Sequence, residues 1–253
     1  MGISFREDDK DLAFLQYCGE EDLQQLANIL IYDVSGDGQE RITSELAQEE
    51  RFKKLEGRAD RYRKCWDLIA GELQHYGGDT IVNLFRRGGV AYKELLGDAC
   101  EKLKVKFDKK KSAYEIEDCL LAEVVNRSWK DMDDEQKRQI LDGVGLDETI
   151  DSAKIDEKLR NAVFSSASAS MFLASTTAGM VAKAVALNVG MGGVRYVVAR
   201  VPVVGLGGPI LWTVLGLSAI PSISGTAYRV TIPASIQVAY MRRKIEFNDH
   251  FGC

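Results

Sequence analysis

Residues 62–79 read YRKCWDLIAGELQHYGGD, and the spacing of their apolar side chains indicates the class of structure. Spacings of four and three residues alternate along this stretch, at Tyr62, Trp66, Ile69, Leu73 and Tyr76. Side chains with this spacing lie on one face of an α-helix, and that face can be buried. The two glycines that follow predict the end of the helix, because glycine adopts the left-handed C-terminal conformation at low cost.

The rest of the first 150 residues follows the same helical period and shows no strand-like alternation. A second apolar face is formed by Leu23, Leu26, Ala27 and Leu30. Ser112 and Glu115 have the spacing of a capping box, in which each side chain satisfies a free backbone N–H of the other residue, and Asp133 predicts another helix start. Further helices are expected at 80–87 and from Val90 to Leu103. The sequence therefore predicts an all-α fold that begins with a multi-helix domain.

Charge divides the chain into two unlike parts. Residues 1–160 contain 26 Lys and Arg against 36 Asp and Glu, whereas residues 161–253 contain 7 against 2. No acidic residue occurs between Glu157 and Glu246, and all four prolines lie in that interval. We therefore expect an acidic helical domain over residues 1–150 and a basic, apolar helical region over residues 151–253.

The basic part is rich in glycine, alanine and serine and then becomes strongly apolar. A ridge of small residues at spacing four would let another helix approach closely; it consists of Ser166, Ser170, Ala174, Ala178, Ala182, Ala186 and Gly190. Residues 201–228 are uncharged, but Gly207-Gly208-Pro209 and Pro221 bracket a helix only about 18 Å long, too short to cross a bilayer alone. We expect a helical hairpin, whose second arm continues past Pro233 to a basic end.

Three arrangements of this hairpin are compatible with the sequence. It could be a buried helical pair with its arginines facing the acidic domain, an amphitropic element at a membrane surface, or a permanent span. The candidate contacts with membrane or partner are Arg195, Arg200, Trp212, Tyr228, Arg229, Arg242, Arg243 and Lys244.

Two long stretches resemble one protein family over nearly the whole chain. WDLIAGELQHYGGD at 66–79 and SGTAYRVTIP at 224–233 resemble the uncharacterised bacterial YaaW family, as does DLAFLQYC at 11–18. The middle of the chain is also distantly similar to the ubiquinol-cytochrome c chaperone domain. These resemblances imply a helical fold and a role near membrane complexes, and they imply no catalytic residues.

Motifs that suggest chemistry are matched only in part. Glu72 and His75 share a helix face, but a di-iron bundle needs two such pairs, and the chain contains two histidines in all. Asp33 to Gly38 imitates the start of a calcium loop, yet the twelfth position is Ser44. Six lysines between Lys102 and Lys111 are expected to be a solvated helix end, and we expect no nucleic-acid partner. We therefore expect neither metal nor cofactor. The candidate interaction surface is Glu72, His75, Asp79, Arg86 and Arg87.

Cysteine usage and the N-terminal sequence favour a cytoplasmic location. Five scattered cysteines with no C-x-x-C spacing argue against disulfides and zinc, and Met1 to Leu12 contains no apolar run of the secretory kind. The leading hypothesis is a non-enzymatic, membrane-associated interaction or assembly factor that binds a protein partner, in the cytoplasm or at the periphery of the inner membrane. The alternatives are a soluble-to-membrane pore-forming protein and a soluble helical enzyme or ligand-binding protein.

Overall fold

The computed structural model describes residues 2–33, 39–41, 44–76, 89–129, 132–146, 155–189 and 228–251. These parts are helical, and the β pairing in them is a single bridge between Tyr32 and Glu40. The predicted all-α class is confirmed. The principal helices are α1 (Glu20–Ile31), α2 (Glu50–Lys54), α3 (Trp66–Tyr76), α4 (Tyr92–Lys102), α5 (Ala113–Ser128), α6 (Asp134–Gly143), α7 (Ile155–Ser165), α8 (Ala167–Val189) and α11 (Tyr228–Phe251). Short 3-10 turns are η1 (Ala13–Tyr17), η2 (Leu46–Gln48) and η3 (Arg63–Cys65).

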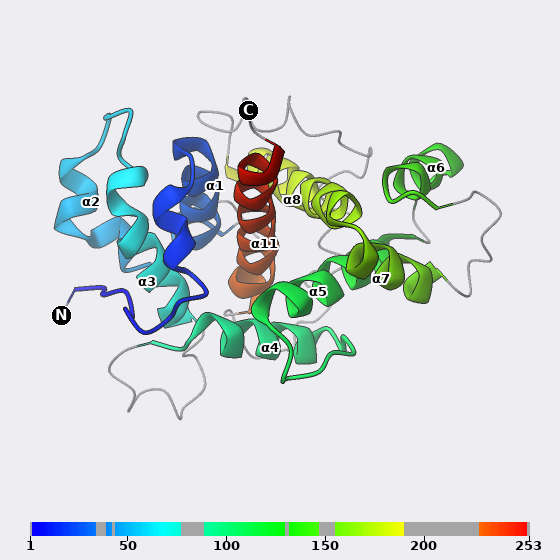
Figure 1. The fold of residues 1–253 in the computed structure, drawn as a ribbon. Coiled ribbons are helices and arrows are strands. Elements are labelled where there is room, and N and C mark those ends of the chain that lie inside the picture. The colour runs from blue at the N-terminus through cyan, green and yellow to red at the C-terminus, as the bar shows by residue number, and fades with distance from the viewer. Residues whose placement is uncertain are drawn as a thin grey trace.

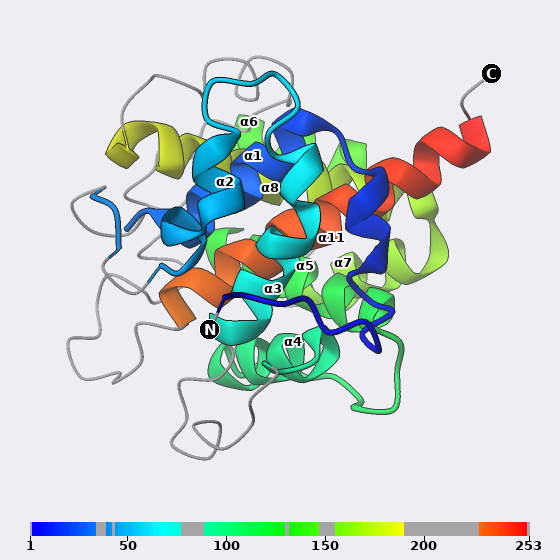
Figure 2. The same ribbon diagram turned by 90° about the vertical axis from the view of Figure 1, so that its left-hand side faces the viewer.

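Helix α11 lies in the middle of the bundle, with α1, α3, α4, α5 and α8 packed around it (Figures 1 and 2). The residues from 230 to 239 are buried on every side of the helix, the apolar ones being Val230, Ile232, Ala234, Ile236, Val238 and Ala239. A helix that is buried on all sides is stable only when other elements enclose it. The helix also continues through Pro233, although proline lacks the N–H that would bond the carbonyl of the preceding turn.

One hydrophobic core includes residues from both compositional parts of the chain. Leu26 of α1, Ile69 of α3 and Leu120 of α5 belong to the same buried cluster as Leu173 of α8 and Ile236 of α11. The change of composition near residue 150 therefore does not coincide with a break in packing among the described residues.

The local helix signals are confirmed where the structure describes them. The apolar stripe of the opening stretch forms η3 and then α3, which ends at Tyr76. Ser112 Oγ accepts the N–H of Glu115 at 3.3 Å, and Glu115 Oε2 accepts the N–H of Ser112 at 3.0 Å. Asp133 likewise accepts the N–H of Gln136 at 2.8 Å. The helix expected at 80–87 and the first arm of the hairpin lie outside the described residues.

The ridge of small residues lies on α8, which packs along α11. Ser170, Ala174, Ala178 and Ala182 are buried there. Ser170, near the start of α8, contacts Arg243, near the end of α11, so the two helices run antiparallel. Among the helices that the structure describes, none combines the length and the apolar character needed to span a membrane.

Candidate interaction site

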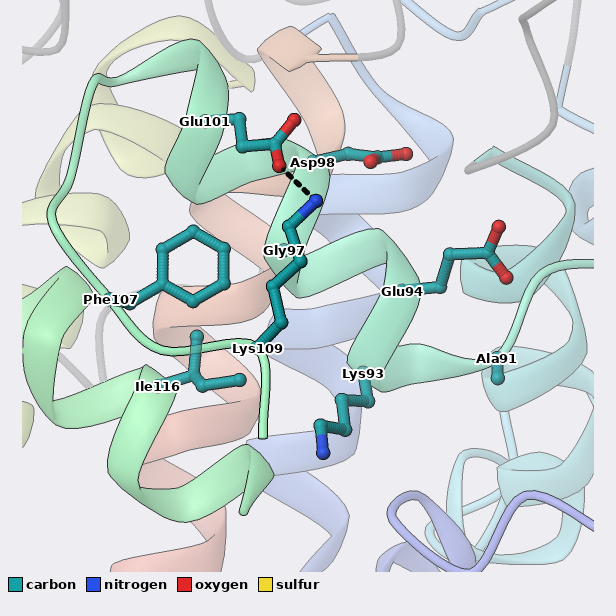
Figure 3. A pocket seen from close by; sticks show the side chains of 9 residues that line it. All are labelled: Ala91, Lys93, Glu94, Gly97, Asp98, Glu101, Phe107, Lys109 and Ile116. Carbon is teal, nitrogen blue, oxygen red and sulfur yellow. Dashed lines mark ion pairs between the residues drawn. The ribbon is translucent and has the colours of Figure 1, made fainter. Parts of the chain in front are cut away.

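A groove opens on the surface between α4 and the start of α5 (Figure 3). Its volume is about 360 Å³, and all the residues that line it lie between Ala91 and Ile116. Helix α4 forms one side, and the loop that returns the chain to α5 forms the other. The capping box at Ser112 starts α5 at a defined residue and so sets where this loop ends.

The floor of the groove is apolar. Ile116 is buried, Phe107 is half-buried against the core, and Gly97 leaves the backbone of α4 bare between them. A methyl group built on Gly97 would lie 3.7 Å from the ring of Phe107, an ordinary van der Waals distance. A small apolar side chain from outside would find the same kind of contact there.

Charged side chains form the rim. Glu94, Asp98 and Glu101 follow one another at a spacing of four and three residues on one face of α4, and Lys93 and Lys109 lie beside them. Lys109 Nζ pairs with Glu101 Oε1 at 2.6 Å. Partial burial raises the pKa of Asp98, and the neighbouring carboxylates of Glu101 and Glu94 raise it further. The rim is therefore a place where a further cation would relieve repulsion.

A buried ionic cluster on the adjoining part of α5 joins α4, α8 and α11. Glu117 accepts the hydroxyl of Tyr92 at 2.9 Å, Arg242 Nε at 3.1 Å and Arg243 Nη1 at 2.7 Å. Asp118 accepts Arg243 Nη2 at 2.7 Å and the hydroxyl of Ser170 at 2.6 Å. Two guanidinium groups thus balance two carboxylates in the interior, which is the arrangement that makes buried charge tolerable.

Arg243 holds its charge firmly within this cluster. Its side chain is 1% exposed and also donates to the backbone carbonyls of Ala239 and Tyr114. Burial alone would lower its pKa, but the carboxylates of Glu117 and Asp118 raise that pKa above its usual value. The guanidinium therefore acts as a permanent connection between α11 and α5.

The cations at the basic end of the predicted hairpin arm thus form their ion pairs inside the fold. Arg242 also donates to the carbonyl of Asp11 at 2.8 Å, and Lys244 pairs with Asp22 of α1 at 2.8 Å. Carboxylates of α5 hold the guanidinium groups of Arg242 and Arg243 within the fold. Contact of these two residues with a membrane or partner stays a prediction.

The other predicted membrane or partner contacts are only partly described. Tyr228 is half-buried at the start of α11, with the ammonium of Lys102 5.0 Å from its ring centre. Arg229 is half-buried beside it. Arg195, Arg200 and Trp212 lie outside the described residues, so their role stays a prediction.

Two residues of the predicted interaction surface, Glu72 and His75, lie on α3, and only His75 is accessible. Glu72 is buried and accepts the backbone N–H groups of Glu45 and Leu46, both at 3.1 Å, so it anchors η2 to α3. His75 is partly exposed, with Nδ1 3.8 Å from the carboxylate of Glu45. Asp79, Arg86 and Arg87 lie outside the described residues. Nowhere in the described parts do three or more His, Cys, Asp or Glu side chains gather as metal ligands would.

The sequence contained a signal for the groove that our interpretation did not use. Glu94, Asp98 and Glu101 have the spacing of one helix face, and the lysine-rich segment follows directly. That segment was expected to be a solvated helix end, but Phe107 and Lys109 within it form a wall of the groove. Because α5 folds back onto α4, the acidic face of α4 and the lysine-rich segment line the same groove.

Comparison with known proteins identifies full-length relatives. The UPF0174 protein YaaW of Escherichia coli K12 is 38% identical over 243 residues, which cover 94% of this chain and 95% of the relative. A UPF0174 protein of Helicobacter pylori J99 is 33% identical over 247 residues, covering 94% of this chain and 92% of the relative. A model described as a domain of unknown function, DUF3944, matches residues 7–42. No solved structure matches.

Proposed function

Since the chain belongs to the UPF0174 family that includes YaaW, we propose that it is a non-enzymatic, membrane-associated interaction or assembly factor. In this proposal the helical bundle binds a protein partner, and the uncharged stretch 201–228 contacts the membrane.

The observation that carries this proposal is the placement of α8 and α11. The C-terminal end of α8 and the N-terminal end of α11 lie at the same side of the molecule (Figure 2). These ends flank the part of the chain that contains residues 201–227. A hairpin that dips into a bilayer must leave and return through one face of the protein, and this geometry meets that requirement.

In this proposal the cations of the basic part have two different roles. Arg242, Arg243 and Lys244 attach α11 to α5 and α1, so they hold the base of the hairpin to the bundle. Arg195, Arg200 and Arg229, which flank the uncharged stretch in sequence, are then the cations for lipid phosphates. The distant similarity of the middle of the chain to the ubiquinol-cytochrome c chaperone domain stays a prediction, and an assembly role would follow from it. The location at the inner membrane stays a prediction too.

Flotation with liposomes that contain anionic lipid tests the membrane part of the proposal. The full-length protein is expected to float, and a variant with Leu211→Asp and Leu215→Asp is expected to stay at the bottom, because charge in an apolar segment opposes insertion. The matched control places the same two charges on exposed helix positions, Gln139→Asp and Ser168→Asp, and should float like the unaltered protein.

Failure of the unaltered protein to float would reject the membrane role. Equal flotation of all three forms would show that residues 201–228 are not the membrane element. Release of a trapped dye during the same experiment would instead support the pore-forming alternative.

A further inference from the structure

Lys109 places its own side chain across the groove between α4 and α5 (Figure 3). Its ammonium pairs with Glu101, while its stem lies in a groove whose floor is apolar. The side chains of Lys109 and Glu101 are 77% and 52% exposed. Exposed ion pairs of this kind contribute little free energy, so another cation can displace Lys109.

The rest of the rim offers a further position for a cation. No described cation lies within ion-pair distance of Asp98, although it stands one turn from Glu101 on the same face of α4. Together with Glu94, the carboxylates follow the groove for about 10 Å, the length of two helical turns. That is the length of a short peptide segment.

We infer that this groove docks a cationic amphipathic segment of a protein partner. A lysine or arginine of that segment replaces Lys109 on Glu101 and pairs with Asp98, and an apolar side chain packs on Phe107 and Ile116. Lys109 is then a built-in competitor that occupies the groove when the partner is absent. This inference names the partner chemistry for the proposed function and rests on its protein-binding part.

Charge and shape together determine which kind of segment the groove can bind. An acidic segment would meet the carboxylates of Glu94, Asp98 and Glu101, which repel it. A purely apolar segment would partly desolvate the carboxylate of Asp98 without offering it a cation. A segment with alternating cationic and apolar faces satisfies both the rim and the floor.

Binding of synthetic peptides to the full-length protein tests the inference. The probe is a fluorescent amphipathic helix of lysine and leucine, and its control has glutamate in place of each lysine. In fluorescence anisotropy the lysine peptide should bind and the glutamate peptide should not. Loss of the competitor in Lys109→Gln should tighten binding of the lysine peptide about threefold, as expected for one exposed ion pair.

Further variants test the carboxylates of the rim and the apolar floor of the groove separately. Asp98→Asn with Glu101→Gln should weaken binding about fivefold, as expected for two exposed pairs, and Asp134→Asn with Glu135→Gln on the exposed face of α6 should leave it unchanged. Gly97→Leu fills the groove and should abolish binding, whereas Gly97→Ala adds one methyl group and should retain it. Both substitutions favour helix over glycine, so both variants should fold, which circular dichroism can check.

Three results would overturn the inference. They are equal binding of the lysine and glutamate peptides, undiminished binding by Gly97→Leu, and weaker binding by Lys109→Gln. A doubled mass in light scattering that Asp98→Asn with Glu101→Gln abolishes would also overturn it, by assigning the groove to a second copy of the chain. The experiment contains no lipid, so its failure is distinguishable from failure of the membrane proposal.

Discussion

Arg243 lies against Glu117 and Asp118 in the interior of the bundle, and the energy of this cluster depends on all three charges remaining together. Removing the guanidinium would leave two buried carboxylates with only Arg242 and neutral groups beside them. An uncompensated buried charge is far more costly than the loss of an exposed ion pair.

We expect Arg243→Met to lower the free energy of unfolding by about 3–5 kcal/mol, as found for broken buried ion pairs. Lys244→Met is the matched control, because Lys244 also pairs with a carboxylate but its side chain is 38% exposed. The control should cost about 1 kcal/mol or less. Urea denaturation of both variants measures the difference, and equal losses would mean that the cluster around Arg243 is open to water.

Glu72 is a buried carboxylate of a different kind, because backbone N–H groups surround it and burial dominates its titration. Burial raises its pKa to about 7, and the hydrogen bonds from Ser44, Leu46 and Glu45 only partly oppose the rise. The folded protein therefore binds a proton at Glu72 more readily than the unfolded chain does. This group contributes stability fully below its unfolded pKa, and that contribution is lost as the pH rises to about 7.

Glu72→Gln should remove this part of the pH dependence. Relative to the variant, the unaltered protein should lose about 2–3 kcal/mol of unfolding free energy between pH 5 and pH 7, given about 1.4 kcal/mol for each unit of pKa shift. Denaturation at several pH values checks the prediction, with Glu45→Gln as a control because that carboxylate is exposed. Parallel pH profiles for the unaltered protein and Glu72→Gln would contradict it.

Helix α8 depends on small side chains where it packs along α11. Ala178 is 4% exposed within the ridge, so a larger residue there would force the helices apart. We expect Ala178→Leu to lower stability by about 1–3 kcal/mol, the usual cost of overpacking. Ser168→Leu, at an exposed position of the same helix, is the control and should have little effect in thermal unfolding. Equal melting temperatures for Ala178→Leu and the unaltered protein would show that α8 and α11 can move apart without loss of stability.

Individual helices could be predicted from the sequence because their signals are local. The apolar stripe before Gly77 and the capping boxes at Ser112 and Asp133 each depend on residues within a few positions of one another. The place of α11 could not be predicted in this way. Arg243 looked like a membrane edge because its carboxylate partner Glu117 is 126 positions away in sequence. The groove was missed for a related reason, since only the fold-back of α5 joins its rim to its floor.

At the scale of the whole molecule, the stability of the bundle depends on α11. A chain that ends before Tyr228 would leave the facing surfaces of α1, α4, α5 and α8 exposed to water. We expect such a chain to lose cooperative thermal unfolding, whereas a chain that ends after Phe247 keeps the buried part of α11 and should retain it. Circular dichroism during heating measures both. A cooperative transition in the shorter chain would show that the remaining helices form a core alone.

This dependence also determines how function should be tested. Truncation near residue 150 removes α7, α8 and α11 together, so a loss of binding would only report a loss of fold. Substitutions at Gly97, Lys109 or residues 201–228 leave the ionic cluster and the core residues of the described helices in place.

The central position of α11 has a consequence for biosynthesis. The ribosome translates α11 after every other helix named in this structure, yet α1, α3, α4, α5 and α8 bury apolar faces against it. While the nascent chain grows towards residue 228, its earlier helices have no cover for these faces, and such surfaces attract aggregation and chaperones. The fold is therefore completed only after α11 has been made, when it inserts between elements made long before it.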